Sequence, residues 1–207
     1  MGIASSRGIA GGGASGSINQ VQASFGSIGG GQGNRVDASW GTIGGGRTNR
    51  VAGSVDSTIG GGASNEATGQ TSTVGGGFDN VASALVATIA GGLGNLASND
   101  RASIGGGEGN TASGPSSTVP GGFGNTASGS SSVVGGGSNN IASGGWSAIA
   151  GGTGNRASGA NAHIAGGSGN LAAGSHSGAV GEDNCTGGRW RYFPRAQENR
   201  SVTSSPR

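Results

Sequence analysis

Glycine-rich runs are the first feature of this sequence that could do chemistry, because a glycine loop can cradle phosphate groups. The runs GGGQGN and GGGEGN, ending at Asn34 and Asn110, are two examples. Neither carries the Lys-Ser/Thr pair that ends a phosphate-binding loop, and neither follows the pattern of a strand leading into a helix. We therefore expect these runs to form turns.

Other reactive side chains are few and scattered. Asp79 lies in a glycine turn, but a calcium-binding β-roll would need Asp at the same place in most turns. His163 and His176 have no Cys or carboxylate at ligand spacing. Cys185 is the single cysteine, so it forms no intrachain disulfide; we expect a buried thiol, with a cross-link between chains as the alternative. No serine lies in a nucleophile elbow with an acid and a histidine behind it. We expect no catalytic residues, no metal and no cofactor.

The composition excludes an ordinary globular core. Of 207 residues 52 are Gly, and only 4% are aromatic and 10% charged. All eleven basic residues are Arg, and five of them lie in residues 188–207, so the body has no basic stripe for nucleic acid. There is no run of 18 apolar residues and no apolar signal-peptide core at the start. We expect this segment neither to bind nucleic acid nor to insert directly into a membrane.

Asparagine recurs every 15 residues, with one step of 16 between Asn49 and Asn65. A strict period distinguishes a folded repeat from a disordered glycine-rich chain. Stacked repeats place identical residues above one another, and an Asn amide can both donate and accept hydrogen bonds along such a ladder. The predicted ladder comprises Asn34, Asn80, Asn95, Asn110, Asn125, Asn140, Asn155 and Asn170, with Asn19, Asn49 and Asn65 in the same register.

A branched aliphatic residue precedes most of these asparagines by six positions. A small apolar residue, first Val and then Ala, follows each Asn by two positions. A further small residue, such as Ser57 or Ala87, lies two positions before the branched one. The branched column comprises Ile28, Ile43, Ile59, Val74, Ile89, Ile104, Val119, Val134, Ile149 and Ile164.

These columns predict an all-β fold. Alternate residues in each half of the unit are small or apolar, which is the period of a strand, and the glycine-rich linkers suit turns. Two short strands and two turns form one coil of a parallel β-roll or β-solenoid. About eleven coils over residues 19–188 make a rod on the order of 50 Å long. Residues 1–18 are expected to be irregular, and residues 189–207 to be a basic, non-repetitive tail or cap.

A coil this thin has room for one branched residue, one Ala and one more small side chain. We expect such a coil to leave one flank uncovered, and therefore predict that several chains pack side by side along the rod. A three-fold bundle is the simplest closed form.

The half-repeats S-x-V-x-G and N-x-A-x-G resemble the head repeats of YadA-like trimeric autotransporter adhesins. The resemblance runs from about Asn19 to Gly188, and SGAVG at Ser177–Gly181 matches the family form directly. It implies a left-handed parallel β-roll, a homotrimer and adhesion to host or matrix surfaces. The unit also resembles repeats of phage tail fibres. The usual family unit is one residue shorter, so we expect a different turn after the branched residue, and the heptads and barrel strands of a full-length adhesin are missing from this chain.

Outward-facing residues supply candidate contacts. Thr42, Thr58, Thr73, Thr88 and Thr118 stand just before the branched column, and a flat Thr row suggests an ice-binding face. The row breaks at Val133, Ala148 and His163, and Thr is also a good strand residue. Candidate aromatic contacts, for a partner, a sugar or a neighbouring chain, are Phe25, Trp40, Trp146, Phe78 and Phe123.

The sequence thus predicts a non-catalytic structural or adhesive repeat module of a bacterial surface adhesin or phage fibre, located outside the cell or on a virion. Its expected partners are copies of itself and a host or matrix protein or glycan surface, bound multivalently. An ice-binding solenoid is the alternative.

Overall fold

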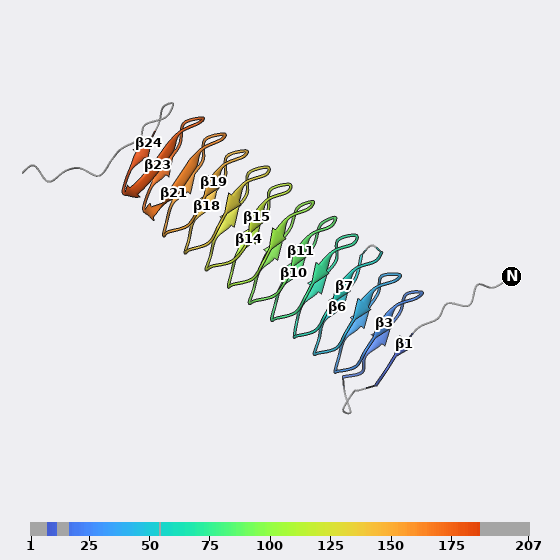
Figure 1. Cartoon of the computed structure of the whole chain (residues 1–207). Helices are drawn as coiled ribbons and strands as arrows, with labels where there is room; N and C mark the ends of the chain where they lie inside the picture. The colour runs from blue at the N-terminus through green and yellow to red at the C-terminus, as the bar shows by residue number, and fades with distance from the viewer. Residues whose placement is uncertain (1–7, 12–16, 54, 187–207) are drawn as a thin grey trace, which may run out of the picture.

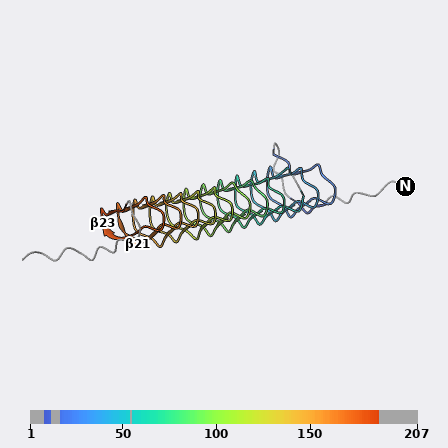
Figure 2. The same cartoon turned by 90° about the horizontal axis from the view of Figure 1, so that it is seen from above.

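The computed structural model of the chain describes residues 8–11, 17–53 and 55–186. These residues form a rod of stacked coils, with the first coils at one end and the last at the other (Figure 1). Seen from above, the coils are narrow and follow one another along a nearly straight axis (Figure 2). Each coil contributes one strand to each of two parallel 12-stranded sheets. The described residues contain no helix, so the predicted all-β parallel solenoid of two-strand coils is confirmed.

The first sheet holds the strands of the branched column. Its strands are β1 (Gly8–Ile9), β3 (Ser27–Ile28), β5 (Thr42–Ile43), β7 (Thr58–Ile59), β9 (Thr73–Val74), β11 (Thr88–Ile89), β13 (Ser103–Ile104), β15 (Thr118–Val119), β17 (Val133–Val134), β19 (Ala148–Ile149), β21 (His163–Ser168) and β23 (Gly178–Glu182). We call it the Thr sheet.

The second sheet, which we call the Asn sheet, starts just after each asparagine. Its strands are β2 (Gln20–Val21), β4 (Arg35–Val36), β6 (Arg50–Val51), β8 (Glu66–Ala67), β10 (Val81–Ala82), β12 (Leu96–Ala97), β14 (Thr111–Ala112), β16 (Thr126–Ala127), β18 (Ile141–Ala142), β20 (Arg156–Ala157), β22 (Leu171–Ala172) and β24 (Cys185–Thr186). In both sheets each strand pairs in register with its counterpart one coil away, for example Ile89 with Ile104.

The ladder starts earlier than the expected boundary at residue 19. Gly8 and Ile9 pair with Ser27 and Ile28, so part of the segment predicted to be irregular forms the first strand of the Thr sheet. At the other end, the last described pairing joins Leu171 and Ala172 to Cys185 and Thr186. The tail or cap predicted for residues 189–207 lies outside the described residues.

The asparagine column is buried and fully engaged. In the middle of the rod, Asn95 accepts on Oδ1 the backbone N–H of Asn110 at 2.9 Å. Its Nδ2 donates to the carbonyls of Gly91 and Gly107, both at 3.0 Å. Nδ2 also donates to Oδ1 of Asn80 in the preceding coil at 3.1 Å. The side chain therefore ties three successive coils together and supplies hydrogen bonds to backbone groups of the turn that the sheets leave unpaired.

The turn between the Thr sheet and the Asn sheet contains a third ladder that the sequence did not reveal. The residue two positions before each asparagine pairs in parallel with its counterpart, as Arg47 does with Ala63 and Phe78 with Leu93. The backbone N–H of Arg47 donates to the carbonyl of Gly62 at 2.9 Å. This edge of the rod is thus hydrogen-bonded from coil to coil, although its side chains vary widely.

One chain closes its own core. In the branched column, Ile43, Val74 and Ile89 are 0% exposed. Ala97 in the facing column and Asn110 in the asparagine column are also 0% exposed. The expectation that a single coil leaves a flank of its core uncovered is therefore wrong. The reason is that one aliphatic residue, one Ala and the Asn side chain of each coil fill the space between the two sheets. Burial of the core supplies no argument for association of chains.

Candidate interaction surfaces

Groups that could carry catalysis or bind metal are dispersed along the rod. His163, His176 and Cys185 are all exposed, so the thiol is not the buried one expected from the sequence. Within residues 8–11, 17–53 and 55–186, no three His, Cys, Asp or Glu side chains gather at metal-binding distance. The described residues also form no helix that could cross a membrane.

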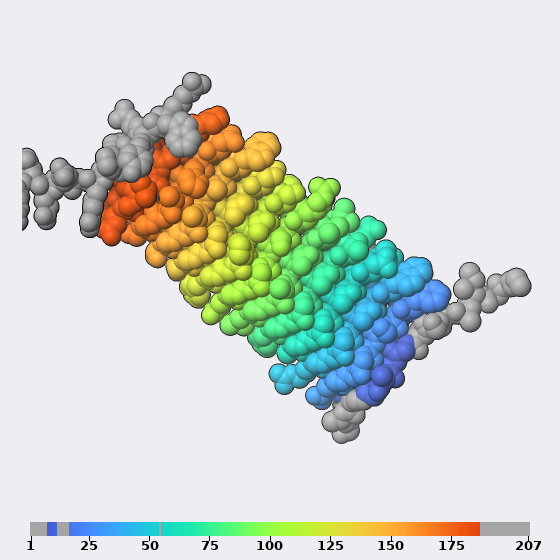
Figure 3. Space-filling view, viewed as in Figure 1, coloured from blue at the N-terminus to red at the C-terminus, as the bar shows by residue number. Residues whose placement is uncertain are grey.

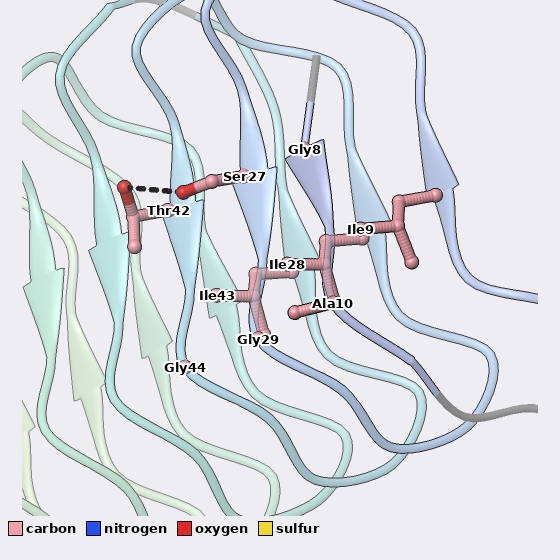
Figure 4. Close-up of a pocket in the computed structure, with 9 residues that line it drawn as sticks. All are labelled: Gly8, Ile9, Ala10, Ser27, Ile28, Gly29, Thr42, Ile43 and Gly44. Carbon is pink, nitrogen blue, oxygen red and sulfur yellow. Dashed lines mark hydrogen bonds between the residues drawn. The ribbon is translucent and has the colours of Figure 1, made fainter.

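A hollow of about 370 Å³ lies beside the first three strands of the Thr sheet (Figure 4). Its wall is mainly apolar and includes Ile9, Ile28 and Ile43, which come from successive strands. On the same wall, the Ser27 hydroxyl donates to the Thr42 hydroxyl at 3.3 Å. None of the nine lining residues is ionisable, so this hollow offers no acid, base or metal ligand.

The Thr row runs along the outer face of the Thr sheet. Thr58 pairs in register with Thr42 on one side and with Thr73 on the other, and Thr73 pairs with Thr88. Each of these side chains is half-buried. Two positions after each Thr, the chain carries Gly44, Gly60, Gly75 or Ala90, so the side chains on this side of the row are small. Ser103 separates Thr88 from Thr118.

The aromatic candidates lie on the two edges of the rod. Phe78 and Phe123, 48% and 52% exposed, are on the edge that carries the third ladder. Phe25, Trp40 and Trp146 are on the opposite edge, in the turn that leads from the Asn sheet back to the Thr sheet. Phe25 and Trp40 stack with ring centroids 5.1 Å apart and planes 11° apart. The structure therefore brings Phe25 and Trp40 together and leaves the other three aromatic residues separate.

This second turn forces every residue of the Trp146 column into the left-handed backbone region, whatever its type. Values of φ are 58° at Phe25, 56° at Trp40, 57° at Val86 and 53° at Trp146. From the sequence we expected turns at the glycine-rich linkers, but not a left-handed backbone throughout this column. Its residues are Phe25, Trp40, Asp56, Thr71, Val86, Arg101, Ser116, Ser131, Trp146, Asn161 and His176, which we call the αL column. The mixed residue types gave no signal for it.

Charged residues on the outer face of the Asn sheet form a short chain of contacts, which was also missed. Nε of Arg35 lies 2.7 Å from Oδ2 of Asp37, and the guanidinium of Arg50 lies 3.4 Å from the carboxylate of Glu66. The Arg side chains are nearly half exposed, so each pair contributes at most about 1 kcal/mol. These contacts give the first coils a charged face, in contrast to the uncharged Thr row.

The space-filling view shows the visible face as parallel ridges, one per coil (Figure 3). Three surface features distinguish this scaffold: the Thr row, the charged contacts of the Asn sheet and the aromatic residues of the two edges. No family model matches the sequence, and a search of curated proteins finds no match.

Proposed function

We propose that this chain is a non-catalytic structural and adhesive module, acting outside the cell as part of a bacterial surface adhesin or a phage fibre. The observation that carries the proposal is the exposure of Trp40, Phe78, Phe123 and Trp146 on the edges of a hydrogen-bonded rod. Exposed aromatic side chains are common anchors for binding partners. A rigid scaffold presents them at fixed positions, so several weak contacts add through multivalency.

The proposed partner surface is a host or matrix protein or glycan. The test is binding of the purified chain to immobilised matrix proteins and to a glycan array, first free and then coupled to beads at high density. Multivalent display is expected to strengthen binding by a factor of about 10²–10⁴. Equal, negligible binding in both formats would contradict the adhesive role.

Association into a homotrimer is also part of the proposal. Since one chain closes its own core, burial gives no support for a trimer, and this part of the proposal rests on the resemblance to trimeric adhesin heads. Sedimentation equilibrium is the direct measurement. A folded chain that sediments as a monomer at all concentrations removes the trimer and leaves the adhesive role to be judged by the binding experiment.

A second candidate function is ice binding through the Thr row, favoured by the in-register stack of Thr42, Thr58, Thr73 and Thr88. Thermal hysteresis measures it. If Thr73→Leu and Thr88→Leu leave the hysteresis of the chain unchanged, the row does not contact ice. Ser98→Leu on the exposed face of the other sheet is the matched control.

A further inference from the structure

Trp146 occupies a backbone position that suits its side chain poorly. Its φ is 53°, and its backbone N–H donates to the carbonyl of Ser130 at 2.8 Å, which fixes the turn. Bulky residues are outliers in the left-handed region, whereas Asn tolerates it. Asn161, one coil later in the αL column, has nearly the same φ of 55°. Backbone preference therefore does not explain the tryptophan.

Burial does not explain Trp146 either. The side chain is 65% exposed, more than any other aromatic residue in the part of the chain that the structure describes. Trp40 in the same column is 54% exposed and has the Phe25 ring stacked on it. A residue that strains its backbone and stays in solvent contributes little to stability, which points to a role in binding.

The Phe25–Trp40 pair shows that a planar ring can stack on a tryptophan of the αL column. The two rings come from successive coils and lie nearly parallel, with centroids 5.1 Å apart. The spacing of coils therefore matches the spacing of stacked planar rings. A flat group can lie one coil away from a tryptophan of this column without any change in the backbone.

The neighbours of Trp146 in the αL column are short and polar. They are Ser131 in the preceding coil and Asn161 in the following coil. The residue before Trp146 is Gly145, and a Cβ built there would meet no atom within 4 Å. The column positions one coil before and one coil after Trp146 therefore carry short hydrogen-bonding side chains, whereas the position before Trp40 carries the Phe25 ring.

The surroundings are uncharged. The sequence contains no ionisable residue between Glu108 and Arg156, and the nearest ionisable members of the αL column are Arg101 and His176. A neutral ligand suits this stretch, because it loses no solvation of charge on binding. A pyranose ring combines an apolar face of C–H groups, which can stack on an indole, with hydroxyls at its rim.

We propose that Trp146, Ser131 and Asn161 form a binding site for one pyranose ring of a neutral glycan. The ring stacks on the indole, and its hydroxyls exchange hydrogen bonds with the Asn161 amide and the Ser131 hydroxyl. This inference deepens the adhesive function proposed above and rests on it. A second copy of this chain is a poorer occupant, because stable protein interfaces need an apolar cluster, and the column residues on either side of Trp146 are polar.

The test is titration of the full chain with cellohexaose, chitohexaose and a β-1,4-galactan hexasaccharide, followed by the NMR signal of the Trp146 indole N–H. The signal is assigned by its disappearance in Trp146→Asn. At least one sugar is expected to shift the Trp146 signal in a saturable manner and to protect it from solvent exchange. A uronic acid oligomer is expected to bind no better than the neutral sugars.

Trp146→Asn is expected to weaken binding of the responding sugar by at least about tenfold, and Trp146→Phe by less, because Phe keeps an aromatic face. Because Asn suits the backbone here, Trp146→Asn should melt no lower than the parent chain. Val86→Asn introduces the same residue in the same column away from the site, and should leave sugar affinity unchanged.

Three results would overturn the site: no response to any of the three sugars, a response that survives Trp146→Asn, or a sedimentation change in that variant showing that Trp146 holds two chains together. Failure here is distinguishable from failure of the adhesive role. A chain whose Trp146 ignores sugars but which still adheres through its other aromatic residues contradicts only this inference. A chain that adheres to nothing contradicts the broader proposal.

Discussion

The carboxamide oxygen of Asn80 lies 3.0 Å from the backbone nitrogen of Asn95, one coil later, and accepts its hydrogen bond. The same oxygen also accepts from Nδ2 of Asn95 at 3.1 Å. Asn95 in turn accepts the backbone N–H of Asn110, so each asparagine depends on the one before it. The column is therefore a continuous buried hydrogen-bond ladder, and removal of one asparagine should leave a backbone N–H of the next coil without its acceptor.

Replacement of Asn95 tests this ladder. Asn95→Ala leaves the backbone N–H of Asn110 without its acceptor and the Gly91 carbonyl without its side-chain donor. We expect the free energy of unfolding to fall by about 2–4 kcal/mol, from the unpaired buried groups and the lost volume. Denaturant titration measures the change. Ser98→Ala, at an exposed position three residues away, should alter stability by less than about 0.5 kcal/mol, and an equal loss in both variants would contradict the ladder.

Buried serines of one column should respond in opposite ways to removal of the hydroxyl. Oγ of Ser132 is buried without a hydrogen-bond partner among the described residues, whereas Oγ of Ser57 donates to the Gly69 carbonyl at 2.6 Å. Ser132→Ala should be neutral or stabilise by up to about 1 kcal/mol, and Ser57→Ala should destabilise by about 1 kcal/mol. Melting temperatures compared by calorimetry check the pair. The chain itself places Ala87 and Ala102 at equivalent positions, and destabilisation by Ser132→Ala would show that its hydroxyl is paired.

Close stacking at the glycine turn makes Gly46 difficult to replace. Its φ is +94°, and a Cβ there would overlap the carbonyl oxygen of Gly62 in the next coil. Gly46→Ala should therefore reduce the free energy of unfolding by about 2 kcal/mol or more. Gly61→Ala is the matched control, because a Cβ at Gly61 meets nothing within 4 Å. Chemical denaturation of both variants gives the comparison, and equal stability of the two would refute the close approach.

Relief of backbone strain should stabilise the αL column away from the proposed glycan site. Val86 is β-branched, has φ 57° and is 46% exposed, while its N–H donates to the Gln70 carbonyl at 2.9 Å. Val86→Asn keeps this bond and places a tolerant residue in the left-handed region, so stability should rise by about 1 kcal/mol. The reverse change, Asn161→Val, should lower stability by a similar amount. Thermal melts of the two variants would disprove the assignment if both moved in the same direction.

Much of the fold could be predicted from the sequence, because each core column repeats with one period. The spacing of Asn80 and Asn95 gave the stacking partners, and Ile89 and Ala97 gave the two facing interior columns. The same spacing placed Thr73 beside Thr88 on the outer face. These predictions depend only on which residues recur, and recurrence is visible in a single sequence.

Other features could not be read from the columns because their residues do not recur. Arg47, Ala63 and Phe78 share no property, yet their backbones form the third ladder. Trp40, Val86 and Ser116 share a left-handed backbone that the turn imposes on them. Stacking of Phe25 on Trp40 was likewise not predicted, since it required the orientation of both turns.

By itself, the sequence determined the coil, its register and the residues that face inward, because small side chains at a fixed period fit no other packing. Only the tertiary structure decided that one chain closes its own core, that one turn pairs through backbone alone and that Trp146 is exposed at a left-handed backbone position. The physical reason is that backbone hydrogen bonds and φ values are common to all residue types, so they leave no trace in the residue pattern until the coils are stacked.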